Sequence, residues 1–184
     1  MRGDETSARP IGLRRGVVQL AEHSGRWAEL FDEEAARLRG RIGDLAVDIQ
    51  HVGSTPVEGL IAKPILDIAL ALRAHADVPA LTECLCEAGY IYRRDSGDDG
   101  GHLFVRECEP NVRTIHLHAV LHADPQWGNY LLFRDTLRRD PAARARYAEL
   151  KRRLAQQYLD DRPAYTTGKE TFIRGVLAAP PETV

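Results

Sequence analysis

Residues 46–72 constrain the fold most strongly, because they contain two apolar segments separated by a loop of small and turn-forming residues. Residues 46–52 and residues 64–72 have the length and composition of β-strands. The second segment has Ile, Leu or Ala at most positions, which predicts a strand buried on both faces. Asp67 interrupts this segment, and a buried carboxylate without a partner is energetically costly. Asp67 is therefore expected to have a charged partner, to bind a metal ion or to face a ligand.

Hydrophobic periodicity in the rest of the chain predicts more strands and several amphipathic helices. Asp124-Pro125 and Asp140-Pro141 each place a capping residue before a proline at the first helical position. The sequence predicts a mixed β-sheet in the first two thirds, flanking helices and a C-terminal helical layer, which is an α/β (α+β) fold. The expected elements are an edge strand at residues 17–20, a helix from Ser24 to about Gly40, strands at 46–52 and 64–72, a helix at 76–88, strands at 90–92, 102–108 and 112–121, and helices that start at Asp124, Asp140 and Pro163.

The length of 184 residues suits one domain, which we expect at residues 17–178. Residues 1–16 are expected to be a disordered lead-in, residues 179–184 a tail, and residues 93–101 a mobile loop. The net charge of −2 argues against broad binding to nucleic acid or to a membrane surface. Three cysteines without a CxxC pair indicate reduced thiols, which suggests a cytoplasmic protein.

Lysine is rare in this chain. Of 25 basic residues only three are lysines, namely Lys63, Lys151 and Lys169, so each lysine is a candidate site at which an ammonium group is needed. We expect Lys63 and Lys169 to meet an anion. Lys151 lies in an arginine-rich segment and is interpreted, with Asp135, as part of a solvated surface.

Gly53 and Ser54 follow the first strand and precede Asp67, an order typical of nucleotidyltransferases of the polymerase-beta type. Such a Gly-Ser turn can present backbone N–H groups and a hydroxyl to phosphate oxygens. A carboxylate on the neighbouring strand can hold Mg²⁺ together with those phosphates. Ala69 stands where the usual pattern has a second carboxylate, and a tight turn without any ligand is the alternative interpretation of Gly53-Ser54.

Alternation along the last predicted strand places His116 and His118 on the same face. Such a pair suits metal binding or phosphate binding, and Asp67 or His51 would complete a metal site if the strands are adjacent. Two half-buried histidines that are hydrogen-bonded to neighbours are the alternative. Farther along, Tyr165 and Lys169 are expected four residues apart on one helix face, and Arg134 is a further candidate for phosphate binding.

The segment at residues 51–68 resembles the signature of GrpB-like proteins; it reads His-Val-Gly-Ser-Thr-Pro-Val-Glu-Gly-Leu-Ile-Ala-Lys-Pro-Ile-Leu-Asp-Ile. The resemblance continues, in the same order, through residues 27–31, 116–118, 133–135, 147–151 and 165–172, and covers about residues 17–177. It implies a nucleotidyltransferase-like fold in a small cytoplasmic protein. Two positions depart from the family pattern, since Gln50 stands where Glu is frequent and Glu58 where Pro is usual.

The resulting hypothesis is a protein that binds a nucleoside triphosphate with Mg²⁺ and transfers a nucleotidyl group to a small molecule. Catalysis would consist mostly of positioning and charge neutralisation. One alternative is a metal-dependent hydrolase built on the histidine pair and Asp67, and another is a non-catalytic nucleotide- or coenzyme-binding module. The candidate catalytic residues are Asp67, His116 and His118, the candidate metal ligands are Asp67 and His118, and the candidate binding residues are His51, Gly53, Ser54, Lys63, Arg134 and Lys169.

Overall fold

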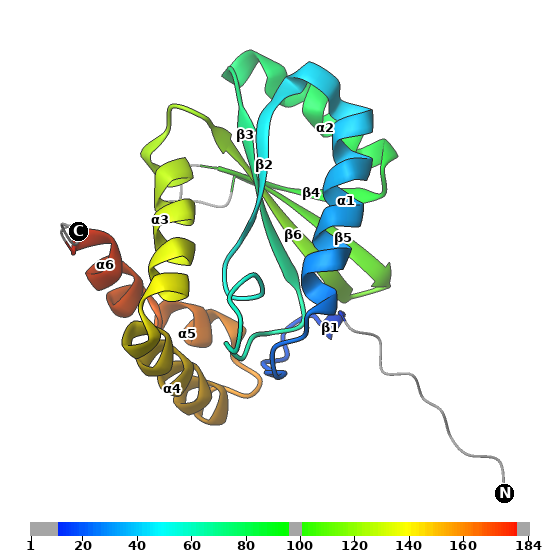
Figure 1. The fold of residues 1–184 in the computed structure, drawn as a ribbon. Helices are drawn as coiled ribbons and strands as arrows, with labels where there is room; N and C mark the ends of the chain where they lie inside the picture. Colours follow the sequence, from blue (N-terminus) through cyan, green and yellow to red (C-terminus); the bar gives the residue numbers. More distant parts are fainter. Residues whose placement is uncertain (1–10, 96–100, 180–184) are drawn as a thin grey trace, which may run out of the picture.

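The computed structural model describes residues 11–95 and 101–179, which are built around a six-stranded mixed sheet (Figure 1). The strand order is β2-β3-β6-β5-β4, and the short strand β1 also pairs with β6. Strands β3 and β6 are parallel and the other pairs are antiparallel. The α/β (α+β) fold with a mixed sheet is therefore confirmed. The strands are β1 (Leu13–Arg14), β2 (Ala46–Val52), β3 (Leu66–Leu72), β4 (Tyr90–Asp95), β5 (His102–Glu109) and β6 (Val112–Leu121).

The central strand β3 separates two different layers. Its even-numbered residues Leu66 to Leu72 belong to the largest hydrophobic core, with helices α1 (Arg26–Ile42) and α2 (Val78–Glu87). Its odd-numbered residues Ala69 and Ala71 pack instead with Trp127. Successive side chains of a strand point to opposite faces, so β3 is buried on both sides, as its composition predicts. Asp67 shares the face of Ala69 and Ala71.

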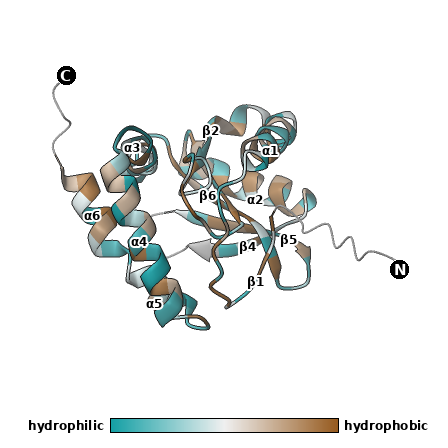
Figure 2. Cartoon of the chain, turned by 60° about the horizontal axis from the view of Figure 1, so that its bottom comes forward, coloured by the Kyte–Doolittle hydropathy of each residue, from teal (hydrophilic) through white to brown (hydrophobic). Residues whose placement is uncertain are grey.

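The second layer consists of the C-terminal helices, which lie across the sheet from α1 and α2 (Figure 1). The side chains of Asp124 and Asp140 accept hydrogen bonds from backbone N–H groups of the first helical turns, which confirms the predicted caps. Figure 2 shows hydrophilic and hydrophobic residues interleaved along α1 and α6. The helices are α3 (Pro125–Arg139), α4 (Pro141–Gln157), α5 (Arg162–Thr167) and α6 (Glu170–Ala178), and short 3-10 turns occur at Gly43–Leu45 and His75–Asp77.

The loop between β2 and β3 is held by the C-terminal layer. Val57, Leu60 and Ile61 are buried in a cluster with residues of α3 and α4, including Phe133 and Tyr147. Burying apolar side chains contributes about 25 cal/mol per Å², so this packing fixes the loop against α4. Side chains of α4 can therefore reach the residues that follow β2.

Three sequence expectations are wrong. Residues 17–20 form no strand; Val18 is buried against Leu154 and Tyr165 instead. Residues 11–16 are not a disordered lead-in, because β1 pairs with β6. The last helix is two helices, because α5 ends at Thr167 and α6 begins at Glu170; at Gly168, between them, an added Cβ would lie 2.6 Å from a methyl group of Leu154.

The predicted mobile loop at residues 93–101 is corrected in part, because β4 extends to Asp95; residues 96–100 lie outside the described residues. The predicted lead-in at residues 1–10 and the tail at residues 180–184 lie outside them as well. Within the part of the chain that the structure describes, no helix has the length and apolar character needed to cross a membrane.

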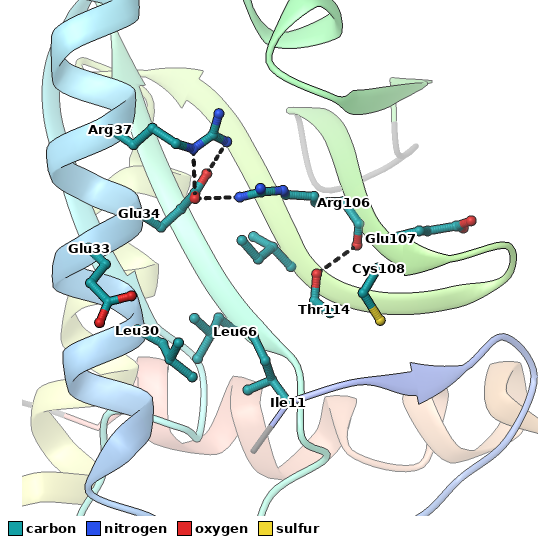
Figure 3. A pocket seen from close by; sticks show the side chains of 11 residues that line it. Ile11, Leu30, Glu33, Glu34, Arg37, Leu66, Arg106, Glu107, Cys108 and Thr114 are labelled. Atoms are coloured by element: carbon teal, nitrogen blue, oxygen red, sulfur yellow. Dashed lines mark hydrogen bonds and ion pairs between the residues drawn. The ribbon is translucent and has the colours of Figure 1, made fainter. Parts of the chain in front are cut away.

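The buried carboxylate of Glu34 links α1 to the sheet through hydrogen bonds. Glu34 is 6% exposed and accepts hydrogen bonds from Arg37 and, at 2.6 Å, from Arg106 on β5 (Figure 3). It also accepts a hydrogen bond at 2.6 Å from the hydroxyl of Tyr90 on β4. Burial raises the pKa of Glu34, but the hydrogen bonds from Arg37 and Tyr90 and the charge of Arg106 outweigh it, so the net shift is downward. The carboxylate is charged at neutral pH and joins three elements of the fold.

Candidate functional site

Strand register brings three predicted site residues together on the face that the C-terminal helices cover. In the parallel pair of β3 and β6, Asp67 is opposite His116 and Ala69 is opposite His118. The adjacency of these strands, on which the sequence argument depended, is confirmed. The imidazole rings of His116 and His118 lie 6.4 Å apart between centroids, and His118 also contacts the ring of Tyr130 at 5.5 Å.

Asp67 lies directly beneath the turn that follows β2. Gly53 has a φ of +74°, a conformation that side chains other than glycine rarely adopt, and a Cβ at this position would lie 2.7 Å from Oδ2 of Asp67. The Asp67 side chain nevertheless keeps 35% of its surface exposed. The glycine of the Gly-Ser turn thus permits the carboxylate to sit against the backbone while remaining open to a ligand.

His116 is held in one tautomer by two partners. Nδ1 of His116 lies 3.2 Å from Oδ1 of Asp67, a carboxylate oxygen that can only accept, and Nη2 of Arg162 lies 3.1 Å from Nε2. Nδ1 therefore donates and Nε2 accepts, which is the pattern of a neutral imidazole. Burial lowers the pKa of His116 to about 4, and the hydrogen bond and charge of Asp67 offset this only in part. At neutral pH His116 is uncharged.

Asp67 is charged at neutral pH. Burial acts to raise the pKa of its carboxyl group, but the hydrogen bond from His116 and the neighbouring positive charges, including Lys63, hold it well below its usual range. A charged carboxylate beside a neutral imidazole can accept hydrogen bonds or coordinate a cation.

Four cationic side chains surround this one carboxylate, and we call them the cationic cluster: Lys63, Lys151, Lys169 and Arg162. Each of the four interacts electrostatically with Asp67, and they come from the β2–β3 loop, α4, the residue before α6, and α5. All three lysines of the chain are in this cluster. Burial lowers the pKa of all three amines, that of Lys63 to about 7 and that of Lys151 well below its ordinary value, so the charge of the cluster depends on how many of the amines are protonated.

The aromatic ring of Tyr165 lies between two members of the cationic cluster. Nζ of Lys63 is 5.4 Å and Nζ of Lys169 is 4.8 Å from its ring centroid, and Tyr165 is 1% exposed. Tyr165 and Lys169 therefore lie in contact, although Tyr165 is in α5 and Lys169 is the residue before α6, so they do not share one helix face. Such cation–π contacts favour the charged amines and hold them at this position.

Lys63 is poised to change its charge near neutral pH. Burial lowers its pKa to about 7, with smaller contributions from the charges of Lys169 and Arg162, while Asp67 acts in the opposite direction. Burial also lowers the pKa of Lys169. A bound anion would restore the protonated forms of both amines.

Lys151 is not the solvated surface residue that the sequence suggested. It is 2% exposed, and its Nζ donates to the carbonyl oxygen of Ile61 and lies 3.0 Å from Oγ of Ser54. Its amine also lies 4.7 Å from the ring centroid of Tyr147, one helical turn earlier. The rarity of lysine was the sequence signal that could have identified it. Arg162, also missed, gave no such signal because arginines are numerous.

Two predicted binding residues are not brought to the cationic cluster. His51 is 6% exposed, stacks on Phe31 of α1 at 4.6 Å between ring centroids, and is hydrogen-bonded to Thr55. Burial lowers its pKa to about 4. His51 therefore packs toward α1, on the other side of the sheet from Asp67.

The guanidinium of Arg134 is hydrogen-bonded to other residues of the protein and does not reach the cationic cluster. Its guanidinium donates to the side chain of Gln50 at 2.9 Å, to the carbonyl oxygen of His51 at 3.1 Å, and to both carboxylate oxygens of Asp135. This makes Arg134 a link between α3 and the edge strand β2. Gln50, where the family often has Glu, is its partner in this contact.

The site suits one Mg²⁺ ion but not two. Asp67 is an accessible carboxylate, and Mg²⁺ is commonly held by one or two carboxylates together with substrate phosphates and water. Ala69 is fully buried with Trp127, so the usual second carboxylate position is closed. No group of three or more His, Cys, Asp or Glu side chains that could hold a metal ion occurs in residues 11–95 and 101–179. Ligation of a metal by Asp67 and His118 stays a prediction.

A surface pocket lies on the opposite side of the sheet. It has a volume of about 660 Å³ and is lined by residues of α1, β3, β5 and β6, among them the apolar Leu66 and Ile115. Figure 3 shows the charged side chains of Glu34, Arg37 and Arg106 at one end of this pocket. Leu66 and Ile115 are the sequence neighbours of Asp67 and His116, so they point away from the cationic cluster. The pocket and the cluster are separate features.

Comparisons with known proteins agree with the resemblance seen in the sequence. A family model described as GrpB protein matches residues 17–179. A glutamate-rich protein GrpB from Alkalihalophilus pseudofirmus is 36% identical over 170 residues, which cover 91% of this chain and 98% of that protein. The crystal structure of conserved protein GrpB from Enterococcus faecalis has a TM-score of 0.78 at 31% identity and covers 86% of this chain and 94% of that one.

A more distant structural neighbour is the Cid1 poly(U) polymerase, solved with Mg and 3'-dATP bound. It matches with a TM-score of 0.53 at 13% identity, over 80% of this chain and 49% of that one. At this identity the match concerns the fold alone, and it agrees with the predicted nucleotidyltransferase-like architecture. The chain belongs to the GrpB family and has a nucleotidyltransferase-like fold.

Proposed function

We propose that this protein binds a nucleoside triphosphate with Mg²⁺ at the cationic cluster and transfers its nucleotidyl group to a small molecule. The observation that supports this best is the convergence of all three lysines and Arg162 around Asp67. Charge-assisted hydrogen bonds from such groups to phosphate oxygens are about twice as strong as neutral ones. A polyphosphate would supply the negative charge that one carboxylate does not.

Each residue of the site has a part in this proposal. Ser54 and the Gly53 turn would cradle a phosphate, and Lys63 and Lys169 would neutralise it. The ring of Tyr165 holds both amines in place. Preorganised charges of this kind act where negative charge develops during transfer.

Asp67 would hold Mg²⁺ together with phosphate oxygens, and the ion would neutralise part of the phosphate charge. His116 would keep the Asp67 carboxylate in place, since both of its ring nitrogens are already hydrogen-bonded. His118, on the same face, is the remaining candidate to receive the proton of an acceptor hydroxyl.

A non-catalytic nucleotide- or coenzyme-binding module is the second candidate. The buried Ala69 favours it, because a two-metal transfer needs several carboxylates around its ions. The hydrolase alternative receives no such support, since the described residues contain no group of three or more potential metal ligands.

The test is a thermal-shift titration of the full chain with each nucleoside triphosphate, with and without Mg²⁺, and with adenosine as the control that lacks phosphate. A ligand that binds only the native state raises its stability by RT ln(1 + [L]/Kd). Lys169→Met should weaken ATP binding about tenfold or more, because a hydrogen bond to a charged group contributes about 1.5–3 kcal/mol. Arg153→Met, at an exposed position of α4, is the matched control and should change binding by less than about twofold.

Release of pyrophosphate in the presence of a small-molecule extract separates transfer from binding alone. Pyrophosphate that requires both ATP and the extract supports nucleotidyl transfer. Binding without pyrophosphate release supports the module. Equal shifts with ATP and adenosine, or equal effects of the two variants, would refute phosphate recognition at the cationic cluster.

A further inference from the structure

Within residues 11–95 and 101–179, three buried side-chain atoms have no hydrogen-bond partner, and they belong to neighbouring side chains. They are Nε of Arg113, Nη1 of Arg162 and Oε1 of Glu107. Nε of Arg113 lies 4.0 Å from Oε1 of Glu107, which is too far for a hydrogen bond, and the charges of Arg113 and Arg162 act on each other. Folded proteins pair nearly all of their buried polar groups, so these exceptions together indicate a site that a ligand completes.

A β-bulge turns Arg113 toward the cationic cluster. The register of β5 and β6 shifts between the pairs that contain Ile115 and Arg113, so Thr114 is an extra residue. Thr114 and Ile115 both line the pocket on the other side of the sheet. An extra residue shifts the alternation of side chains by one position, so Arg113 lies on the face of His116 and its charge acts on Lys63.

Four arginines interact at this place, and we call them the arginine group: Arg15, Arg93, Arg113 and Arg162. They come from the residue after β1, from β4, from β6 and from α5. Glu107 opposes their charge at Arg113, and Asp67 opposes it at Arg162. Arginine stays protonated in proteins, unlike a buried lysine. Four permanent positive charges against these two carboxylates favour the binding of an anion.

The arginine group adjoins the carboxylate of Asp67. Nη2 of Arg162 lies 3.1 Å from Nε2 of His116, and Nδ1 of His116 lies 3.2 Å from Oδ1 of Asp67. The side chain of Arg113 is 12% exposed, Arg162 is half-buried and Arg15 is exposed, so the group can be reached from solvent. A molecule held here by an anionic group could extend past His116 toward Asp67, where the nucleotide is proposed to bind.

We propose that the arginine group binds a carboxylate or phosphate of the small molecule that accepts the nucleotidyl group. This rests on the proposed function and specifies the class of its acceptor. Arg113 and Arg162 are partly exposed, so rotation of a guanidinium can turn its unpartnered N–H toward the anion. Guanidinium groups match the geometry of both anions and form charge-assisted hydrogen bonds with them. Oε1 of Glu107 can accept from a hydroxyl or amine of the same molecule.

The binding test uses the full chain with its cationic cluster filled by Mg²⁺ and α,β-methylene-ATP, which cannot transfer its nucleotidyl group. Calorimetry at pH 7 then titrates inorganic phosphate in one arm and acetate in the other, which separates the two anions. We expect one further anion to bind. Arg113→Met should weaken its affinity about tenfold or more, whereas Arg14→Met, at an exposed arginine of β1, should change it less than about twofold. If Arg113→Met does not fold, judged by its thermal transition, Arg15→Met replaces it and should weaken the affinity about threefold.

Turnover tests the class of acceptor directly. A small-molecule extract is separated on an anion exchanger at pH 7, and pyrophosphate release is measured with ATP, Mg²⁺ and each fraction. The retained fraction should support release and the unretained fraction should not. Arg113→Met should raise the half-saturating amount of the retained fraction about tenfold or more and change the KM for ATP less than about threefold. A purely structural role of Arg113 would not produce this difference.

Release that requires the unretained fraction, or equal effects of Arg113→Met and Arg14→Met on anion affinity, would overturn an anionic acceptor at the arginine group. A chain that binds the nucleotide but no further anion overturns this inference alone. A chain that binds phosphate or acetate through Arg113 but binds no nucleotide supports the anion site and refutes the nucleotide proposal.

Discussion

Two glycines have nearly the same backbone conformation, and comparing them gives the contribution of the close contact between Asp67 and Gly53 to the free energy of unfolding. Gly53 has a φ of +74° and Gly59 a φ of +72°. A Cβ added at Gly59 would meet no atom within 4 Å, whereas one added at Gly53 would lie 2.7 Å from Oδ2 and 3.1 Å from Cβ of Asp67. The substitutions Gly53→Ala and Gly59→Ala therefore share the backbone strain and differ in the clash.

The magnitudes follow from these contacts. Left-handed backbone at a residue with a Cβ costs about 1–2 kcal/mol, which we expect for Gly59→Ala. Overpacking adds about 1–3 kcal/mol, so Gly53→Ala should cost about 2–5 kcal/mol in total. In an Asp67→Ala background the contact with Oδ2 disappears and only the Cβ contact remains. The extra cost of Gly53→Ala should then fall by more than half.

The assay is equilibrium unfolding in urea at pH 7, with the midpoint compared at unchanged slope. The four chains that combine Gly53→Ala and Asp67→Ala form a double-mutant cycle, which isolates the coupling between the two positions. Equal costs for Gly53→Ala and Gly59→Ala would refute the reasoning. So would an unchanged cost of Gly53→Ala when Asp67 is already alanine.

Two further predictions concern charge. Glu34→Gln leaves Arg37 and Arg106 without their buried partner and should lower the free energy of unfolding in urea by about 3–5 kcal/mol. The control Glu33→Gln, at a side chain that is 61% exposed, should lower it by less than about 1 kcal/mol. Similar losses for the two variants would contradict a stabilising role of the Glu34 hydrogen bonds. Because burial lowers the pKa of Lys63 to about 7, and an anion binds the protonated amine more tightly, sulfate affinity should fall as pH rises from 6 to 8. Sulfate keeps its own charge over this range, so calorimetric affinities that do not change with pH would contradict a titrating lysine in the site.

Local patterns predicted much of the fold. Residues 46–52 form a strand with the predicted bounds, and the aspartates before Pro125 and Pro141 cap helices as expected. These features depend on residues within one turn or one strand, so the sequence holds the information. The break between α5 and α6 was missed, and so was the requirement for a small residue at Gly168, where an added Cβ would lie 2.6 Å from a methyl group of Leu154 on another helix.

The sequence by itself determined which side chains share a strand face. Alternation placed His116 and His118 together, and the composition of β3 singled out Asp67 as the residue that needs partners. Only the tertiary structure decided what those partners are. Lys151 and Arg162 come from helices far along the chain, and Arg134 and His51 are directed elsewhere. The physical reason is that the side of a helix that becomes buried depends on the apolar residues of other elements that pack against it, and these are distant in the sequence. The apolar residues of the β2–β3 loop bury one side of α4 and bring Lys151 to Ser54.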